Sequence, residues 1–247
     1  RYSQEIKMII EGNVSVKAAV LGNKRSVKRV IVDEKKHDKD TSWILHRCEE
    51  KNIPVVYKTR EEIDALASGK THGGLIAECG NRQYQDISAC LNENPFLCVL
   101  EGVEDPFNLG YVIRTLYSAG CSGLIIRNRD WSNVESTIMK SSAGASEYLN
   151  IVVSDDIPSL IKDVKKHGVK CFAAMRKDAI SCFDADYTGP SLIAIGGEMR
   201  GLSKGVQEQM DQNIYIPYAN DFHMALNASS ATAVLAFEVL RMRNNCI

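Results

Sequence analysis

The chain has 247 residues and a formal net charge of −1, with 45% hydrophobic and 25% charged residues. These values are typical of a globular protein with one large domain or two ordinary ones. No run of about 18 apolar residues occurs, so we expect no membrane span. The first ten residues lack the apolar core of an export signal, and we therefore expect a cytoplasmic protein.

The eight cysteines do not form a metal or disulfide framework in the sequence. No two of them stand in a C-x-x-C pair, and several lie within apolar runs. We therefore expect reduced thiols and no bound metal. They are Cys48, Cys79, Cys90, Cys98, Cys121, Cys171, Cys182 and Cys246.

The first part of the chain, residues 1–82, alternates strands and helices and so predicts a small α/β domain with a mostly parallel sheet. The expected strands are 27–32, 53–57 and 75–79, and the expected helices are 43–51 and 61–67. A basic cluster lies at its start, at Lys24, Arg25, Lys28 and Arg29, and continues to Lys35, Lys36 and Lys39. Local positive charge can bind phosphates whatever the net charge is, but without a second signal a solvated surface is the favoured explanation of this cluster.

A polar stretch over residues 83–94 predicts a linker, and a second α/β domain is expected over 95–247. Its expected strands are 97–100, 124–126, 151–153, 169–174, 192–195 and 214–216. Its expected helices are 109–119, 134–143, 157–167, 204–210 and 226–243. The last helix carries apolar residues at helical spacing, and no internal repeat is present.

The first stretch with chemical content follows the strand at 97–100. Ligands of open parallel sheets bind at the carboxyl ends of strands, so this turn is well placed for a site. Asn108 is a candidate N-cap. Gly110 lies one turn before Arg114 and would leave room beside its guanidinium for an anion or a ribose. A capped helix with an exposed arginine explains the same residues equally well.

Two further stretches follow the strands at 192–195 and 214–216. In the first, Gly196 and Gly197 precede Glu198, where glycine would let the backbone approach a ligand closely. A tight turn is the simpler explanation, and neither a G-x-G-x-x-G nor a P-loop pattern occurs. In the second, small residues open the last helix, and Asn227 and Ser229 are candidate N-caps.

Together, in order and spacing, these stretches over residues 95–247 resemble the three motifs of the SpoU (TrmH-type) 2′-O-ribose RNA methyltransferases of the SPOUT class. The D-P-x-N-x-G-x-x-x-R pattern matches Asp105, Pro106, Asn108, Gly110 and Arg114. The K-x-S-A-G-A pattern resembles residues 140–145. The G-x-E-x-x-G-L pattern matches Gly196, Glu198, Gly201 and Leu202, and the I-P and L-N-x-S patterns match Ile216, Pro217, Leu226, Asn227 and Ser229.

The first domain is similar, more weakly, to the substrate-binding domain that often precedes this catalytic domain. Gly12, Val16 and Ala18 match its opening pattern, and residues 72–77 match an H-x-G-h-x-A segment. That resemblance favours RNA as the ligand of the basic cluster.

The resemblance implies a deep trefoil knot, S-adenosylmethionine as cofactor, a homodimer and an RNA substrate. Ribosomal RNA of the 23S type is preferred over tRNA. The implied cofactor contacts are Ala173, Gly196, Gly197, Ile216 and Leu226. The resemblance also implies four catalytic residues. Arg114 would orient the ribose hydroxyl, and Asn108 would position Arg114 or the ribose. Glu198 would hold the motif loops, and Asn227 would bond across the site.

Two departures from the family pattern leave an alternative open. Ala225 stands where the family usually has Ser, and Met199 stands where it commonly has Gly. The run Asn220–His223 is also atypical, and Asp221 or His223 is a candidate substitute for the missing hydroxyl. A catalytically impaired RNA-binding homologue is therefore the alternative function.

Overall fold

The computed structural model describes residues 8–244, and Cys246 and the outermost ends of the two expected domains lie outside them. The chain forms two compact units. Unit 1 contains the residues up to Gln83 together with Ala143–Tyr148, and unit 2 contains Tyr84–Ser142 and the residues from Leu149 onward. None of the described helices combines the length and the apolar character that crossing a bilayer requires.

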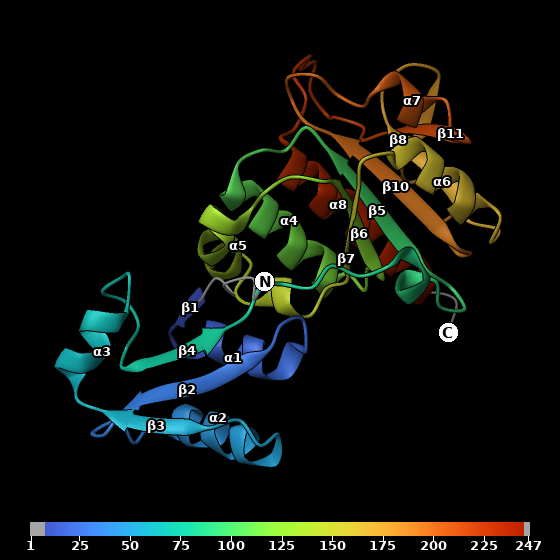
Figure 1. The fold of residues 1–247 in the computed structure, drawn as a ribbon. Helices are drawn as coiled ribbons and strands as arrows, with labels where there is room; N and C mark the ends of the chain where they lie inside the picture. Colours follow the sequence, from blue (N-terminus) through green and yellow to red (C-terminus); the bar gives the residue numbers. More distant parts are fainter. Residues whose placement is uncertain (1–7, 245–247) are drawn as a thin grey trace. The chain divides into compact units, whose positions relative to one another are not determined.

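Unit 1 contains a four-stranded sheet and three α-helices (Figure 1). Its elements are β1 (Met8–Glu11), α1 (Asn13–Gly22), β2 (Val27–Asp33), α2 (Lys39–Glu50), β3 (Val55–Lys58), α3 (Arg60–Leu66) and β4 (Leu75–Cys79). The short 3-10 helix η3 (Ala145–Glu147) also belongs to it.

The sheet of unit 1 has the strand order β1-β4-β2-β3, and only β2 and β3 run parallel. The expectation of a mostly parallel sheet in this unit is therefore wrong. The reason is that α3 is a single short helix, and the chain then turns at Gly73 and Gly74, both at positive φ. The turn returns β4 antiparallel to β2, where it also pairs with β1, a strand that the sequence pattern did not predict.

The helices of unit 1 cover its sheet by apolar contacts. Ile63 of α3 is fully buried against Ile31 and Ile76, which face each other on neighbouring strands. Helix α3 begins at a capping box, in which Thr59 and Glu62 bond to each other's backbone. Helices α1 and α2 pack on each other, and α1 also contacts β1 and β4.

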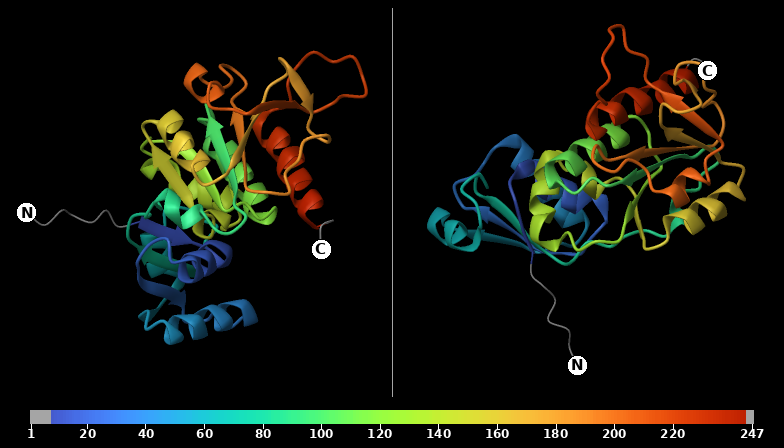
Figure 2. Two further views of the ribbon diagram at one scale, coloured as in Figure 1. Left: turned by 90° about the vertical axis from the view of Figure 1, so that its right-hand side faces the viewer. Right: turned by 90° about the horizontal axis from the view of Figure 1, so that it is seen from above.

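Unit 2 has a seven-stranded sheet with helices on both faces (Figure 2). Its strands are β5 (Phe96–Glu101), β6 (Gly123–Arg127), β7 (Ile151–Ser154), β8 (Lys170–Ala174), β9 (Ala179–Ser181), β10 (Ser191–Gly196) and β11 (Gln212–Tyr215). Its helices are η1 (Ile87–Cys90), α4 (Pro106–Ser118), η2 (Ser132–Val134), α5 (Glu135–Ser141), α6 (Ile157–Lys165), α7 (Lys204–Gln207) and α8 (Ala228–Asn244). Helix η1 lies inside the stretch expected to be a linker.

All strand pairs of this sheet are parallel, in the order β7-β6-β5-β10-β8-β11-β9, as expected for an α/β domain. Helices α6 and α7 pack on one face through Ile157, Ile161 and Val206. Helices α4 and α8 pack on each other, and α8 contacts β10. The strand order reverses between β5 and β10, where ligands of such sheets usually bind.

Candidate functional site

The turns that follow β5 and β10 lie against each other at the reversal point of the sheet. The backbone N–H of Gly197 donates to the carbonyl of Glu101 at 2.7 Å, and the N–H of Gly201 donates to Gly197 at 2.9 Å. The second turn is thus folded back on itself and fixed to the end of β5. The structure therefore joins the first and second motif stretches of the sequence.

The two glycines of the second turn are required by this backbone packing. A Cβ on Gly197 would lie 2.3 Å from the carbonyl oxygen of Gly102, and one on Gly196 would lie 2.3 Å from the carbonyl carbon of Gly201. Real Cβ atoms do not approach this closely. The two glycines therefore let turns of the protein approach each other closely, and their role in approaching a ligand stays a prediction.

Glu101 is a site residue to which the sequence pattern gave no role. It is 9% exposed, and its carboxylate accepts from the backbone N–H of Ser203 at 2.7 Å and from the Ser203 hydroxyl at 3.0 Å. Ser203 in turn caps α7. Glu101 therefore holds the motif turn, the role that was expected of Glu198. The sequence signal that could have identified Glu101 is a carboxylate at the end of a buried strand.

Helix α4 begins at Pro106, three residues before the start expected from the sequence. Its N-cap is Asp105, whose carboxylate accepts from the backbone N–H of Asn108 at 2.8 Å, and Pro106 occupies the first turn. The expectation that Asn108 is the N-cap is wrong, because the side chain of Asp105 accepts the hydrogen bond from the backbone N–H in the first helical turn. Asn108 instead lies inside the first turn, with a half-buried side chain.

Gly110 has a packing role between helices α4 and α5. A Cβ there would lie 1.8 Å from Oγ of Ser141 and 3.0 Å from the carbonyl oxygen of Ile138. The expectation that this glycine leaves room beside Arg114 is wrong, because Ser141 occupies the space.

Arg114 lies on the exposed surface of α4. Its backbone carbonyl accepts from the Ser118 hydroxyl at 2.8 Å. Its guanidinium makes no hydrogen bond or ion pair with any residue between 8 and 244. An unpaired guanidinium retains its five donors and its charge, which suits it to binding a phosphate or a ribose oxygen.

The remaining expected catalytic residues differ in their surroundings. Glu198 is exposed, and the neighbouring Met199 is 95% exposed. Asn227 caps α8, since its Oδ1 accepts from the backbone N–H of Ser230 at 2.8 Å and from the Ser229 hydroxyl at 2.9 Å. The capping role uses only the oxygen and leaves the side-chain amide as a donor.

The expected cofactor contacts divide into buried and accessible residues. Ala173 is fully buried in β8, which pairs with β10 on one side and β11 on the other. It is therefore a core residue, contrary to expectation, because both edges of its strand are occupied. Ile216 is half-buried and Leu226 is 36% exposed. The backbone N–H of Leu226 donates to the hydroxyl of Tyr218 at 3.0 Å.

Apolar side chains are exposed on the same turns. Met199, Met224 and Leu226 are 95%, 67% and 36% exposed. Large apolar side chains gathered on polar turns commonly mark a binding surface. These residues fit a nucleoside cofactor held by backbone groups and covered by apolar side chains.

A hollow of about 320 Å³ opens beside these turns. It lies between the turn after β8 and the loop after β11, at the carboxyl ends of both strands. Its lining combines one arginine, aromatic rings and polar side chains of the atypical run. The lining residues are Arg176, Tyr215, Ile216, Tyr218, Asn220, Asp221, Phe222 and His223.

The basic cluster of unit 1 is not a uniform exposed surface. Arg25 is 5% exposed, and its guanidinium donates to both carboxylate oxygens of the fully buried Glu147, at 2.9 and 2.8 Å. The expectation that Arg25 contacts RNA is therefore wrong, because its charge is paired with Glu147 in the core. Arg29 pairs with Glu78, whose carboxylate raises the pKa of Arg29. Lys24 and Lys28 remain candidates.

No group of three or more His, Cys, Asp or Glu side chains within residues 8–244 is arranged to hold a metal ion. The seven cysteines in this range are all buried and unbridged.

Comparison with known proteins matches residues 95–237, more than half of the chain, to the SpoU rRNA Methylase family. The chain belongs to this family. Residues 9–85 match the domain described as RNA 2′-O ribose methyltransferase substrate binding. The resemblance inferred from the motifs is therefore confirmed.

Relatives and solved structures align over nearly the whole SpoU chain. The 23S rRNA (guanosine-2′-O-)-methyltransferase RlmB of Yersinia pestis is 28% identical over 95% of this chain and 97% of its own. YacO of Bacillus subtilis, named a putative TrmH family tRNA/rRNA methyltransferase, is 26% identical over 98% of both chains. The SpoU methyltransferase AviRb of Streptomyces viridochromogenes in complex with AdoMet has a TM-score of 0.78 at 20% identity, covering 96% of this chain and 91% of its own. The last similarity confirms the α/β fold with the parallel seven-stranded sheet.

Proposed function

We propose that this SpoU protein transfers a methyl group from S-adenosylmethionine to a ribose 2′-hydroxyl of ribosomal RNA. The observation that carries the proposal is the unpaired, exposed guanidinium of Arg114, on the helix that follows the sheet's reversal point in a chain of this family. A ribosomal substrate agrees with the cytoplasmic location expected from the sequence.

S-adenosylmethionine would supply an electrophilic methyl group. The residues that would hold it are on the turns after β10 and β11, namely Gly196, Gly197, Ile216 and Leu226. The exposed side chains of Met199 and Leu226 would cover its apolar parts. The hydrogen bonds from Glu101 to Ser203 and from Gly197 to Glu101 fix one of these turns before any ligand binds. Such preorganisation lowers the entropic cost of binding.

The ribose hydroxyl is a weak nucleophile and must be oriented toward the methyl group. Holding two reactants in attack geometry can lower a barrier by about 7–11 kcal/mol. Arg114 is an unsuitable general base because its pKa exceeds about 12. We assign it the role of orienting the hydroxyl and an adjacent phosphate through its free donors. Asn108, in the first turn of α4, would position the ribose or Arg114, and the side-chain amide of Asn227 would donate across the site.

Ribosomal RNA is the preferred substrate class. The chain matches both the catalytic family and the substrate-binding domain, and the RlmB relative that aligns over 95% of the chain is named for 23S rRNA. Unit 1 would contact RNA through Lys24, Lys28 and Arg29. Arg29 stays 40% exposed beside Glu78 and can still face a phosphate. A tRNA substrate is the alternative within the same chemistry.

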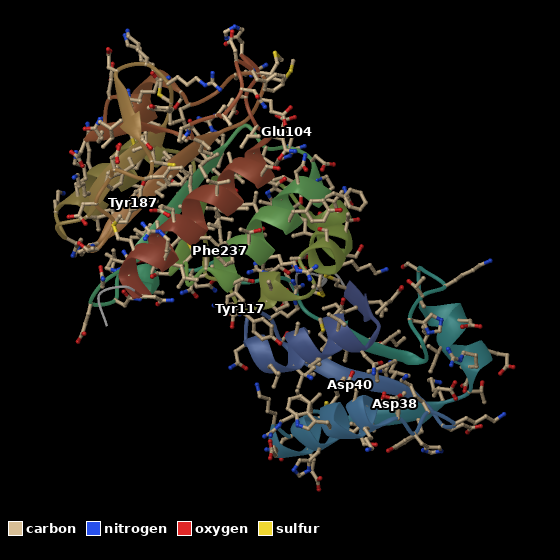
Figure 3. All side chains as sticks on the ribbon, turned by 180° about the vertical axis from the view of Figure 1, so that it is seen from behind. Asp38, Asp40, Glu104, Tyr117, Tyr187 and Phe237 are labelled. Carbon is tan, nitrogen blue, oxygen red and sulfur yellow. The ribbon has the colours of Figure 1, made fainter. Side chains whose placement is uncertain are left out.

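A homodimer formed by the catalytic unit is part of the proposal, as is the trefoil knot implied by the family. Helices α4 and α8 pack on each other and carry four exposed aromatic side chains. Phe237 projects from α8, and Tyr117 lies near the end of α4 (Figure 3). With Phe107 and Tyr111 they are 46–54% exposed. An exposed aromatic surface of this kind favours association with a second copy.

The decisive experiment has two measurements. Calorimetry with S-adenosylmethionine tests cofactor binding, and transfer of a tritiated methyl group to bulk RNA, followed by mapping of the 2′-O-methyl positions, tests activity and substrate. Methylation of 23S-type rRNA supports the proposal, and methylation of tRNA alone supports the alternative substrate. Cofactor binding without transfer to any RNA would instead support the impaired homologue suggested by Ala225.

A further inference from the structure

The atypical run Asn220–His223 forms one wall of the hollow beside the motif turns. Its opposite wall is the turn after β8, which is fixed to β11 by two hydrogen bonds. The N–H of Met175 donates to the carbonyl of Ile214 at 3.0 Å, and the side-chain amide of Asn213 donates to the carbonyl of Lys177 at 2.8 Å. The wall that carries Arg176 is therefore rigid before any ligand binds.

Aromatic rings and a guanidinium gather in this hollow. The guanidinium of Arg176 lies 4.7 Å from the centroid of the Tyr218 ring. The Tyr218 and Phe222 rings are 6.3 Å apart at an interplanar angle of 36°. The hydrogen bond from Leu226 to the Tyr218 hydroxyl holds that ring in place. Phe222 remains 55% exposed, so one face of its ring is open to a ligand.

These groups match the chemistry of a nucleobase. Proteins bind unpaired RNA bases by stacking them on aromatic rings and guanidinium planes and by hydrogen bonding to their edges. A volume of about 320 Å³ is within the range of small-ligand pockets, about 300–1,000 Å³. A phosphate is disfavoured, because the carboxylate of Asp221 lines the same hollow and repels anions.

The carboxylate in the hollow has a hydrogen-bonding capacity that suits one base better than the others. Asp221 is 91% exposed at its side chain, and its Oδ1 lies 3.4 Å from Nε2 of His223. A carboxylate accepts hydrogen bonds through both oxygens. Guanine presents two neighbouring donors on its Watson–Crick edge, whereas adenine presents a donor beside an acceptor.

We propose that the hollow formed by Arg176, Tyr218, Asp221 and Phe222 binds a guanine base of the RNA substrate, with Phe222 and Arg176 stacking the base and Asp221 reading its edge. This inference rests on the proposed RNA substrate. The hollow lies at the same edge of the sheet as the start of α4, because β5, β8 and β11 run parallel. A base held there belongs to the RNA segment that reaches the proposed active site.

The test uses the full chain saturated with S-adenosylhomocysteine, so that the cofactor site is filled. GMP, AMP, CMP and UMP are then titrated separately, and binding is followed by saturation-transfer NMR. GMP is expected to bind most tightly. The Phe222→Ala and Arg176→Ala variants are expected to lose at least about fivefold in GMP affinity, the smallest loss that removal of one stacking partner gives. Asp221→Asn is expected to lose the preference for GMP over AMP.

Phe183→Ala is the matched control, because Phe183 is a similarly exposed aromatic residue, at 49%, outside the hollow. It is expected to bind GMP as the wild type does. The thermal midpoint and the affinity for S-adenosylhomocysteine are expected to be unchanged in all four variants, which excludes misfolding.

Three results would overturn the inference. The first is that GMP does not bind to the saturated protein. The second is that GMP affinity is unchanged in the Phe222 and Arg176 variants. The third is that those variants lose affinity for S-adenosylhomocysteine, which would assign the hollow to the cofactor. Failure of the proposed function can be distinguished from failure of this inference. In that case the wild-type protein would bind no S-adenosylmethionine or would methylate no RNA, irrespective of its affinity for GMP.

Discussion

Arg25 and Glu147 stand 122 positions apart in the sequence and form a two-pronged ion pair with both side chains fully buried. Arg82 donates to the same carboxylate at 3.2 Å. Residues 143–148 therefore belong to unit 1, although the segments on either side of them belong to unit 2. A glycine at position 22 makes this possible, since a Cβ there would lie 1.9 Å from the carbonyl oxygen of Glu147.

Replacing Glu147 by Gln is expected to destabilise the protein strongly. The change leaves two buried guanidinium groups without their carboxylate, and breaking one partner of a buried pair costs about 3–5 kcal/mol. The measurement is the free energy of unfolding in urea. Glu208→Gln is the matched control, because it breaks the exposed pair with Lys204 and should cost less than about 1 kcal/mol. Equal losses in both variants would contradict the argument.

Replacing Gly110 by Ala is expected to lower stability by about 1–3 kcal/mol, because the new methyl group collides with Ser141. The measurement is again the free energy of unfolding. The double variant with Ser141→Gly removes the obstructing side chain and is expected to recover part of the loss. A double variant that shows only the sum of the two single losses would refute the helix-packing role of Gly110.

Replacing Glu101 by Ala is expected to weaken binding of S-adenosylmethionine. It leaves the part-buried N–H of Ser203 without its acceptor, which costs about 1–3 kcal/mol, and it releases the turn proposed to hold the cofactor. Calorimetry measures the affinity. Ser203→Ala removes only the hydroxyl bond and is expected to have the smaller effect. Cofactor affinity that is unchanged in the Glu101 variant would separate this turn from the cofactor site.

Replacing Arg114 by Ala is expected to reduce methyl transfer at least about 100-fold, because the orienting donors are lost. Cofactor affinity should stay unchanged, and so should stability, since the guanidinium has no partner between residues 8 and 244. Tritium transfer and calorimetry provide the two measurements. Arg114→Lys retains the charge but not the planar fork and should recover little activity. Lost cofactor binding in the Ala variant would assign Arg114 a different role.

The buried thiols predict a loss of stability at alkaline pH. Burial raises the pKa of Cys121 and Cys171 from 9.0 to about 12 and the pKa of Cys48 to about 11. The folded state therefore keeps protons that the unfolded chain releases above about pH 9. The stabilisation is fully present below pH 9 and is lost as the pH rises toward 12.

The check is the thermal midpoint between pH 8 and pH 11, together with the thiol reaction rate at pH 8 in a Cys246→Ser background. The midpoint should fall above pH 9, and reaction should require unfolding, since the thiolate is the reactive form. Rapid labelling of the native protein at pH 8 would contradict the burial of these side chains.

Local patterns in the sequence determined most of the elements and the family. Strands such as 75–79 and 151–153 were recognisable because apolar runs between turn residues predict buried strands. The motif residues were recognisable because turns after parallel strands carry ligands. The resemblance of residues 105–114 to the first motif of the family indicated Arg114 as the candidate catalytic residue.

Only the tertiary structure decided what the individual side chains contact. The sequence could not show that Ser141 fills the space at Gly110, that Glu101 rather than Glu198 holds the motif turn, or that Arg25 is buried against Glu147. Each of these contacts joins segments that are far apart in the chain. Periodicity and propensity describe neighbours along the chain, whereas close packing and charge pairing depend on which distant segments the fold brings together.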